Sequence, residues 1–415
     1  MREMKDSGIE WVGKVPATWK IMPNKYIMTK KKVIKEVYDG ENIISLSMNG
    51  VIIRDLEAGG KMPKTFDGYQ IVYPGNLLMC LFDYDVTPRC IGLIKDYGVT
   101  SPAYSQFVMN NGNYSGYYYY YYLMIDHTKA LLHLAKNLRH SLTEEQLGAI
   151  LAPVPTIEEQ QRIVDFLDFK CSKIDATVED IQKEITLLED YKKSVITEAV
   201  TKGLNPDAEM KDSKIFYLGK INKTWNLTKV GYCCKKLYRP FEPSDEALVC
   251  SNKGKVVPRG DTLIGLMTSD DNAMQGICKG DIAIHGMDTW HGAIACSDYD
   301  GKITRVVHVC KADGDNRFVV YWLQHLAFVG VYKLISNGVR GNTSDFRSWD
   351  KVADIYVPNP IKEEQQQIAD YLDTKCSEID SLIADKKRQL DILADYKKSL
   401  IYEYVTGKKE VPVNE

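Results

Sequence analysis

Residues 153–201 read PVPTIEEQQRIVDFLDFKCSKIDATVEDIQKEITLLEDYKKSVITEAVT, and residues 358–406 read PNPIKEEQQQIADYLDTKCSEIDSLIADKKRQLDILADYKKSLIYEYVT. The two stretches align without a gap at an offset of 205 residues, and roughly half of the aligned positions are identical. Shared helical composition alone does not produce identity at this level, so the chain contains an internal duplication.

A shorter motif opens each half of the duplication. Trp11-Val12-Gly13-Lys14-Val15 with Thr18-Trp19 returns as Tyr217-Leu218-Gly219-Lys220-Ile221 with Thr224-Trp225. The repeated unit is therefore an opening motif, a long variable stretch and a closing helix. We expect a first globular module at 1–152, a first helix at 153–203, a second module at 204–357, a second helix at 358–410 and a tail at 411–415.

The apolar residues of both repeated stretches recur every three or four positions, which is typical of a coiled coil. Lys386 replaces the apolar residue found at Ile181, and a cation at one seam position is expected to weaken the pairing but to fix its register and partner. The residues predicted to pair the helices are Ile174, Val178, Ile181, Ile185 and Leu188 in the first copy, and Ile379, Ile383, Leu390, Leu393 and Leu400 in the second.

The ends of these helices also carry sequence signals. Thr156 with Glu159 fits a capping box, and Asn359-Pro360 fits an N-cap followed by proline at the first helical position. Gly203 and Gly407 fit C-terminal stops. Each helix would then run about 45 residues, or roughly 65 to 70 Å.

Duplication also predicts how the helices pair. Two equivalent halves of one chain tend to arrange about a pseudo-twofold axis, which makes two like helices antiparallel. We therefore expect an α+β protein in which two mixed α/β modules are joined by an antiparallel coiled coil. A plain spacer or dimerisation stalk remains an open alternative for the helices alone.

Composition places the chain among ordinary globular proteins. Hydrophobic residues make up 44% of the sequence and the net charge is −3, and no apolar run is long enough to span a bilayer. No apolar segment follows the N-terminus as in a signal peptide, so a cytoplasmic location without a membrane partner is expected. The ten cysteines are scattered without zinc-type spacing, and the repeated Cys171 and Cys376 are expected to be small buried side chains.

Basic and acidic residues are distributed unevenly between the predicted modules and the predicted helices. Residues 1–156 hold 17 Lys/Arg against 15 Asp/Glu and residues 204–360 hold 20 against 18, whereas the helical stretches hold 7 against 11 and 9 against 11. The modules are slightly basic and the helices acidic. An excess this small is weak evidence for a nucleic-acid partner on its own.

The variable stretches have the pattern of short strands separated by glycine and asparagine. Predicted strands are 43–46, 70–73, 77–82 and 106–108 in the first module, and 281–284, 293–295 and 305–309 in the second. Helix-like stretches at 118–138 and 318–335 close the modules, and the tyrosine run at 117–122 is interpreted as part of a core helix or strand. The two variable stretches share almost no sequence, which suits one scaffold that carries two different recognition surfaces.

Lysine and arginine side chains in the loops between these strands are candidates for contacts to phosphates or guanine edges. For each one alone, a solvated surface charge remains the alternative. The candidates are Lys30, Lys31, Lys32, Arg54, Lys61, Lys64, Arg89 and Arg139 in the first module, and Lys235, Lys236, Arg239, Lys253, Lys255, Arg259, Arg305 and Arg340 in the second.

No catalytic motif is recognisable in the sequence: it has no P-loop, no dinucleotide-binding glycine motif and no hydrolase elbow. His285, His291 and His308 lie in one module with Asp281 and Asp288, but their spacing matches no familiar metal motif and surface or core histidines are favoured. A binding subunit without catalytic residues and without a metal is therefore the favoured interpretation.

Taken together, the pattern resembles the specificity (S) subunit of Type I restriction-modification systems. The matching residues are the opening Gly8-Ile9-Glu10-Trp11-Val12-Gly13 with Pro16 and Trp19, the Pro153-Val154-Pro155 and Pro358-Asn359-Pro360 segments, and the two Glu-Glu-Gln-Gln helix starts. The resemblance covers the whole chain in architecture and the repeated segments in detail.

This resemblance implies a non-catalytic subunit that reads double-stranded DNA. Each module would be a target recognition domain for one half of a bipartite target, and the helices would set the spacing and dock two modification (methyltransferase) subunits. Restriction (helicase-nuclease) subunits would complete the complex. The resemblance places S-adenosylmethionine, ATP and magnesium on these partner subunits and no cofactor on this chain.

Two other classes stay open. A bivalent coiled-coil adaptor would bind two proteins and no DNA. A self-contained nuclease or methyltransferase would be active when purified alone.

Overall fold

The computed structural model describes residues 2–57, 63–110, 112–135, 140–260, 273–336 and 344–412. The chain divides into two compact units: the first comprises residues 1–181 with 388–415, and the second comprises 182–387. The division passes through both long helices, so each unit contains one module and one half of each helix.

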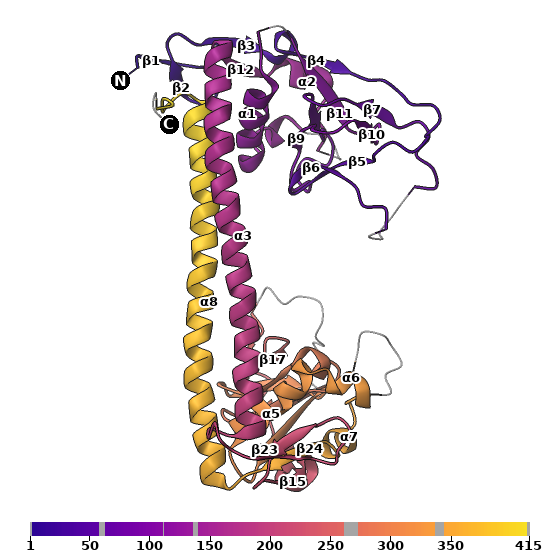
Figure 1. Ribbon diagram of the computed structural model, residues 1–415, viewed down its shortest axis with the longest axis vertical. Helices are drawn as coiled ribbons and strands as arrows, with labels where there is room; N and C mark the ends of the chain where they lie inside the picture. Colours follow the sequence, from indigo (N-terminus) through magenta and orange to yellow (C-terminus); the bar gives the residue numbers. More distant parts are fainter. Residues whose placement is uncertain are drawn as a thin grey trace. The chain divides into compact units, whose positions relative to one another are not determined.

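The first unit is a mixed α/β structure that contains short strands and a helix beside the long helices (Figure 1). A 3-10 helix spans Asn24–Tyr26 and another spans Leu132–Leu134. Its helices are α1 (Ser115–Thr128), α2 (Glu144–Ala149) and the start of α3 (Ile157–Lys202). Its strands are β1 (Met4–Asp6), β2 (Lys14–Pro16), β3 (Lys20–Pro23), β4 (Met28–Lys31), β5 (Ile44–Ser47), β6 (Gly50–Ile53), β7 (Gln70–Val72), β8 (Leu77–Met79), β9 (Ile91–Leu93), β10 (Gly98–Thr100), β11 (Ser105–Met109) and β12 (Leu151–Val154).

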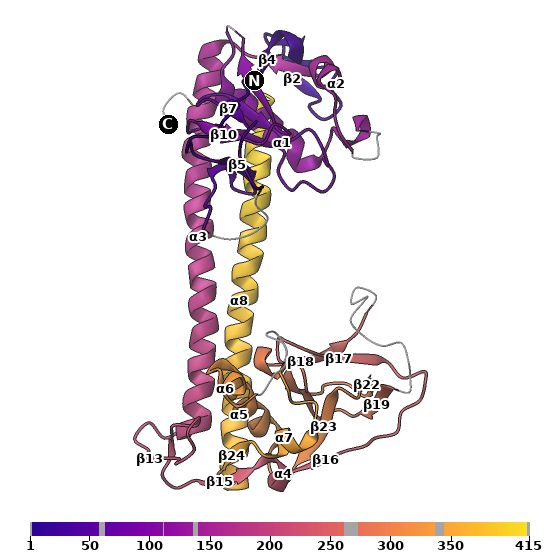
Figure 2. The same ribbon diagram turned by 90° about the vertical axis from the view of Figure 1, so that its right-hand side faces the viewer.

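The second unit has the same kind of architecture (Figure 2). A 3-10 helix spans Thr289–His291. Its helices are α4 (Val230–Cys233), α5 (Asn316–Phe328), α6 (Val331–Ile335), α7 (Trp349–Ala353) and the start of α8 (Lys362–Val405). Its strands are β13 (Met210–Asp212), β14 (Lys220–Asn222), β15 (Asn226–Lys229), β16 (Cys234–Lys236), β17 (Ala247–Ser251), β18 (Lys255–Pro258), β19 (Met274–Ile277), β20 (Ile282–His285), β21 (Ile294–Cys296), β22 (Gly301–Thr304), β23 (Val307–Ala312) and β24 (Tyr356–Asn359).

The two modules share a central sheet although their sequences have diverged. The first module has an antiparallel sheet of order β4-β11-β8-β9, and the second has one of order β16-β23-β20-β21. In both, the strand that precedes the long helix pairs with the strand after the opening motif: β12 with β3, and β24 with β15. The surrounding strands differ, because β18-β17-β22-β19 forms a second four-stranded sheet in the second module only. The two modules therefore share the strand order of their central sheets even where their sequences have diverged.

Each module closes on a helix whose buried residues join the core of the long helices. The tyrosine run lies in α1, and Tyr117, Tyr118 and Tyr121 are fully buried. The Tyr117 hydroxyl donates to the carbonyl of Val405 at 2.7 Å. In the second unit, Phe318 and Trp322 of α5 are equally buried beside Ile368 and Leu372 of α8. The prediction of a core helix or strand at 117–122 is therefore resolved as a helix.

The long helices α3 and α8 pack against each other in each unit. In the first unit, Lys397 Nζ lies 2.5 Å from an Asp175 carboxylate oxygen. In the second unit, Lys192 Nζ lies 2.7 Å from an Asp380 oxygen. These two ion pairs are related by the 205-residue repeat. Contacts of α3 move toward its C-terminus as those of α8 move toward its N-terminus, so the paired segments run antiparallel in each unit.

The predicted seam residues occupy the contact between these helices. Ile174, Ile181, Ile379, Ile383 and Leu400 are buried. The remaining five predicted residues, Val178, Ile185, Leu188, Leu390 and Leu393, are partly buried. Lys386 forms an ion pair with Glu184 at 2.5 Å, which satisfies the cation predicted within the seam.

The predicted helix ends are correct at three of four positions. Thr156 caps α3 by accepting a hydrogen bond from the backbone N–H of Glu159 at 3.3 Å, but the Glu159 carboxylate accepts from Trp19 Nε1–H at 2.9 Å instead of completing the predicted capping box. Gly203 and Gly407 adopt the positive φ values of +89° and +67° that favour glycine. The prediction that α8 begins at Asn359-Pro360 was wrong. Strand β24 continues through Asn359, which is paired with Asn226, so the helix begins at Lys362.

The predicted strands exist with shifted ends, but the helix-like stretches were too long. The first is α1 followed by a 3-10 turn, and the second is broken between α5 and α6 at Gly330, which has φ +76°. The ten cysteines are free thiols, and Cys171 and Cys376 are buried as predicted. No helix among the described residues is long and apolar enough to cross a membrane.

Candidate nucleic-acid interface

Lysine residues lie within or directly after an edge strand of the central sheet in both modules. In the first module Lys30 forms an ion pair with Glu144, and Lys31 Nζ lies 3.7 Å from the centroid of the Tyr73 ring. Lys32, which follows β4, is exposed. At the equivalent strand of the second module Lys235 is exposed and Lys236 lies over the rings of Tyr238 and Trp349, at 5.0 and 5.9 Å. The fold therefore presents two of the predicted lysine clusters at matching places.

A groove of about 510 Å³ opens beside this strand in the second module. It lies where the two sheets of that module meet, because Arg239, three residues after β16, forms an antiparallel bridge with Gly276 of β19. Among the described residues that line it no carboxylate occurs; these are Lys236, Tyr238, Arg239, Pro240, Phe241, Met274, Gln275 and Arg305. Cations interleaved with aromatic rings are the groups that bind phosphates and stack on bases.

The cations of this groove differ in how firmly hydrogen bonds to other protein groups hold their side chains. Arg239 donates two hydrogen bonds to Asp281, from Nε at 2.5 Å and from Nη2 at 2.8 Å. The hydrogen bonds with this buried carboxylate raise the pKa of Arg239 above its ordinary value. Arg305 is exposed, and its Nε–H donates to the carbonyl of Met274 at 3.0 Å. Arg305 and Lys236 are thus placed to reach a ligand, whereas Arg239 holds the groove's wall.

Three further candidates of the second module lie around β17 and β18. Lys253 is exposed in the turn between these strands. Lys255 approaches Asp380 of α8 at 4.0 Å. Arg259 follows β18, and its backbone N–H donates to the carbonyl of Ala247 at 2.8 Å.

Arg89 is the most constrained candidate of the first module. Its Nε and Nη1 donate to the carbonyls of Ile91 and Met48, at 3.2 and 2.9 Å, and its Nη2 donates to the Tyr119 hydroxyl. Arg54 follows β6 and is half-buried, and Lys64 is exposed. Three other candidates, Lys61, Arg139 and Arg340, lie outside the described residues.

The sequence argument missed the aromatic partners of these cations. Tyr238 has 79% of its surface exposed, and with Phe241 it brackets Arg239 and Pro240 in the groove. The alternation of aromatic and basic residues at 236–241 was a signal that could have found this groove. Lys95, Lys397 and Lys398 were also missed, because they come together only in the folded chain.

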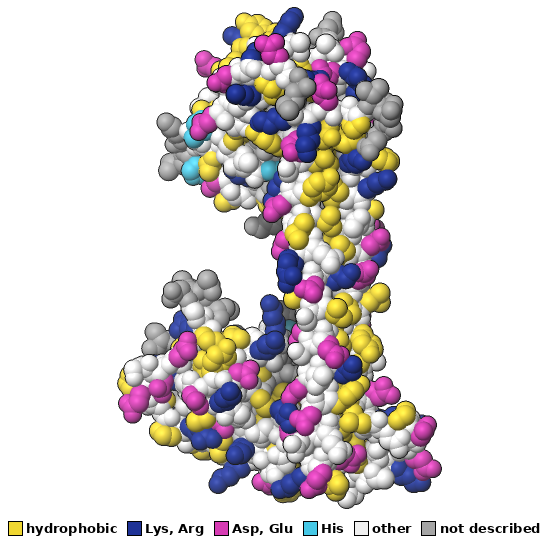
Figure 3. Space-filling model, turned by 90° about the vertical axis from the view of Figure 1, so that its left-hand side faces the viewer, with side chains coloured by type: hydrophobic (Ala, Val, Ile, Leu, Met, Phe, Trp, Pro, Cys, Tyr) yellow, Lys and Arg dark blue, Asp and Glu magenta, His cyan; other side chains and the backbone are white. Residues whose placement is uncertain are grey.

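The long helices carry repeated apolar residues on their exposed sides, and Figure 3 shows hydrophobic side chains along them. Leu187 and Tyr191 are 67% and 55% exposed, and their repeat equivalents Ile392 and Tyr396 are 62% and 52% exposed. Residues four apart share one face of a helix. Each unit thus presents one copy of the same apolar pair, which we call the helix patch.

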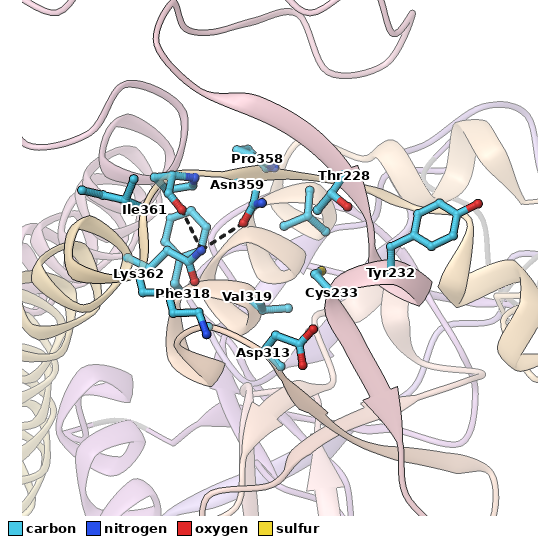
Figure 4. Close-up of a pocket in the computed structure, with 15 residues that line it drawn as sticks. Thr228, Tyr232, Cys233, Asp313, Phe318, Val319, Pro358, Asn359, Ile361 and Lys362 are labelled. Carbon is cyan, nitrogen blue, oxygen red and sulfur yellow. Dashed lines mark hydrogen bonds between the residues drawn. The ribbon is translucent and has the colours of Figure 1, made fainter.

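A pocket of about 350 Å³ lies at the start of α8 in the second unit (Figure 4). Asn359, Ile361 and Lys362 line it together with Tyr232, Cys233 and Asp313. Gln365 closes its base: its Nε2 donates to the Pro360 carbonyl at 2.9 Å and to Asn359 Oδ1 at 3.2 Å, the two bonds drawn in Figure 4. These contacts explain the repeated glutamine structurally and assign no ligand to the pocket.

The histidines of the second module are core or turn residues. His308 is buried with Nε2 2.7 Å from the carbonyl of Phe346, and burial lowers its pKa. His285 Nδ1 accepts the backbone N–H of Asp288 at 3.1 Å. Among the described residues no three His, Cys, Asp or Glu side chains are grouped to hold a metal ion.

No protein-family model matches the sequence. A curated protein of Methanocaldococcus jannaschii, named as the MjaX specificity subunit of a type I restriction enzyme, is 26% identical over 289 residues. The chain resembles a Type I specificity subunit. The alignment covers 65% of this chain and 62% of the relative, so the match spans less than two thirds of that protein's length.

A solved structure shares the fold of this chain. A chain from the structure of a type I R-M system, described for its complex assembly and conformational transition, matches 95% of this chain and 99% of its own length. The TM-score is 0.69 at 14% identity. The HsdS subunit of Thermoanaerobacter tengcongensis also matches 95% of this chain, with a TM-score of 0.48 at 14% identity.

Proposed function

We propose that this chain is the non-catalytic DNA specificity subunit of a Type I restriction-modification complex. Each module reads one half of a bipartite double-stranded target, and the two modules read unlike sequences. The observation that carries the proposal is the duplicated frame: both units share one central sheet order and one helix register, while the residues around the sheets differ.

The distribution of charge and aromatic groups supports DNA as the ligand. The groove of the second module combines Lys236 and Arg305 with Tyr238 and Phe241, and its described lining contains no carboxylate. The matching strand of the first module carries Lys30, Lys31 and Lys32. Phosphate contacts from such lysines position a protein on DNA, and arginine reads guanine edges in the major groove.

The helices would serve two purposes in this complex. As an antiparallel coiled coil they would hold the modules at a fixed spacing, so that both reach grooves on one side of the DNA. The helix patches would dock two identical modification subunits, because each patch presents the same apolar pair in a repeated context. Restriction subunits would then join, and S-adenosylmethionine, ATP and magnesium would act on these partners and not on this chain.

The test is to produce the chain together with its modification subunits in a host lacking other methyltransferases and to sequence the methylated adenines. We expect one two-part motif with unlike halves, which disappears when this chain is omitted. Methylation that does not depend on the chain would contradict the proposal. A complex with two partner proteins that fails to shift DNA would favour the coiled-coil adaptor instead.

A further inference from the structure

A cavity of about 620 Å³ lies in the first unit, between the first module and the long helices. Four cations line it: Arg89 and Lys95 flank β9, and Lys397 and Lys398 come from α8. The rings of Tyr119 and Tyr120 supply part of the wall. These six residues come from three separate parts of the chain that only folding brings together.

Arg89 lines this cavity, and among the described residues no carboxylate forms an ion pair with its guanidinium. Its guanidinium is fixed by the carbonyls of Ile91 and Met48 and by the Tyr119 hydroxyl, all of which are neutral acceptors. A fixed cation with neutral neighbours keeps its full attraction for an anion. Because the guanidinium is already held in place, binding of an anion requires little reorganisation of the cavity wall.

The two carboxylates of the cavity are already engaged. Asp168 accepts a hydrogen bond from the Tyr120 hydroxyl at 2.6 Å, and Asp175 lies 2.5 Å from Lys397 Nζ. Lys398 reaches Asp395, which does not line the cavity, at 3.1 Å. Four cations thus face two carboxylates, which leaves an excess of positive charge in the cavity.

The second unit has the same frame but a different residue at the decisive place. Tyr321 donates to Asp373 at 2.7 Å just as Tyr120 donates to Asp168, which aligns α5 with α1. The second residue of α5 is Arg317, and its guanidinium bridges Asp315, Asp370 and Asp373 at 2.7 Å each. In the second unit, the positive charge of Arg317 is therefore neutralised by carboxylates of the same chain.

The second residue of α1 is Gly116, which lines the cavity of the first unit. A Cβ added there would lie 2.9 Å from a Val164 methyl carbon, so a larger side chain would require the surrounding packing to shift. The first unit keeps an open cationic space where the second unit has an ion-paired arginine. This asymmetry within a duplicated frame points to a ligand of the first unit.

We infer that this cavity binds a phosphate group, held by Arg89, Lys95 and Lys398. The inference rests on the proposed function when the phosphate belongs to the DNA backbone at the first module. A free nucleotide or inorganic phosphate presents the same chemistry. Long helix α8 then contributes directly to ligand binding, in addition to pairing with α3.

The test uses the full chain assembled with its modification subunits and the variants Lys95→Gln and Lys398→Gln. Lys193→Gln is the matched control, because Lys193 is the repeat equivalent of Lys398 and bonds Asp190 at 2.8 Å in the same way. Binding of a random-sequence duplex is measured over a range of salt concentrations. Inorganic phosphate is titrated by calorimetry, and thermal melting checks that all variants fold alike.

For a backbone phosphate, each cavity variant should make the negative slope of log K against log salt shallower by about 0.9, and the control should keep the wild-type slope. An unchanged slope with phosphate binding lost in Lys398→Gln would assign the cavity to a free phosphate. Unchanged DNA slopes and unchanged phosphate titrations in both variants would overturn the inference. If the wild-type complex binds no duplex, the proposed function fails, and the phosphate titration alone decides on the cavity.

Discussion

Gln160 and Gln365 show why the glutamines of the repeated motif persist. Gln160 Oε1 accepts the backbone N–H of Tyr114 at 2.7 Å, and its Nε2 donates to the Pro155 carbonyl at 3.0 Å. Gln365 makes the corresponding bonds to Asp315 and Pro360. Each glutamine therefore ties the start of a long helix to the start of the module's own helix. The motif is structural, and its family resemblance reflects this junction.

We predict that Gln160→Ala destabilises the first unit. The substitution leaves the buried N–H of Tyr114 and the Pro155 carbonyl without this partner, at a cost of about 2 kcal/mol. Gln161→Ala is the control, since Gln161 is exposed. Urea unfolding followed by circular dichroism measures both variants. Equal unfolding free energies for the two would refute the structural role.

His325 gives the second unit a pH-dependent stability. It is buried, its Nδ1 lies 3.0 Å from Thr197 Oγ1, and burial lowers its pKa to about 4. An unfolded histidine titrates near 6.5, so between pH 6.5 and 4 the unfolded state binds a proton that the folded state does not. The stability from neutral His325 is complete above pH 6.5 and falls as the pH drops toward 4.

We predict that the free energy of unfolding of the second unit falls by on the order of 3 kcal/mol from this histidine over that range. His325→Gln should reduce the pH dependence and leave a remainder from His308, whose pKa burial also lowers. Urea titrations at pH 7.5 and 4.5 measure the difference. An identical pH dependence in wild type and variant would contradict this prediction, since it would show that His325 has the same pKa in the folded and unfolded chain.

In the groove beside β16, a phosphate contact and stacking on an aromatic ring can be tested by separate substitutions. Lys236→Gln should lower the salt dependence of DNA binding by about 0.9 in the log–log slope, because a phosphate contact is lost. Tyr238→Ala should weaken binding at every salt concentration without changing the slope, because a ring carries no charge. Fluorescence anisotropy with the assembled complex measures both. Unchanged affinity in both variants would remove the groove from the interface.

The helix patches predict the number of docked partners. Tyr191→Asp or Tyr396→Asp places a charge in one patch and should leave one modification subunit bound per chain, and the double variant should bind none. Native mass spectrometry of the mixed subunits counts the partners. Thr186→Asp, which adds the same charge at an exposed position facing elsewhere on α3, should bind two. Two bound subunits in the double variant would show that docking uses another surface.

The elements that the sequence predicted well are those with local signals. The seam from Ile174 to Leu188 follows from periodicity, and Gly203 and Gly407 end their helices as expected. The start of α8 was misplaced because the pairing of Asn359 with Asn226 is a long-range contact that no local motif encodes. The common strand order of the two central sheets was not predicted from the sequence, because strand order also depends on long-range pairing.

Prediction of the site was weaker for a related reason. Lysine clusters are visible in the sequence, but Arg239 is held by Asp281, 42 residues away, and Arg89 is held by backbone carbonyls. Sequence cannot separate such anchoring cations from exposed ones like Arg305. Tyr238 was missed because its exposure is decided by the packing of two sheets.

Under the proposed function, the duplicated chain is one frame that carries two different readers. The frame comprises α3, α8, the junction glutamines and the shared sheet order. Under the proposed function, the readers are the surfaces around β4 and β16. A change to the helices should therefore alter the target's spacing and leave the base sequences of its halves intact.

The most direct measurement inserts one heptad into each helix, between Ile181 and Gln182 and between Lys387 and Arg388. These points lie between the two units and leave the Lys397–Asp175, Lys192–Asp380 and Lys386–Glu184 pairs in place. Each helix lengthens by about 10 Å, equivalent to about three base pairs of DNA. Sequencing of methylated adenines should then show the original half-sites with a longer spacer, or no methylation. Methylation of the original motif with its spacer unchanged would contradict the account.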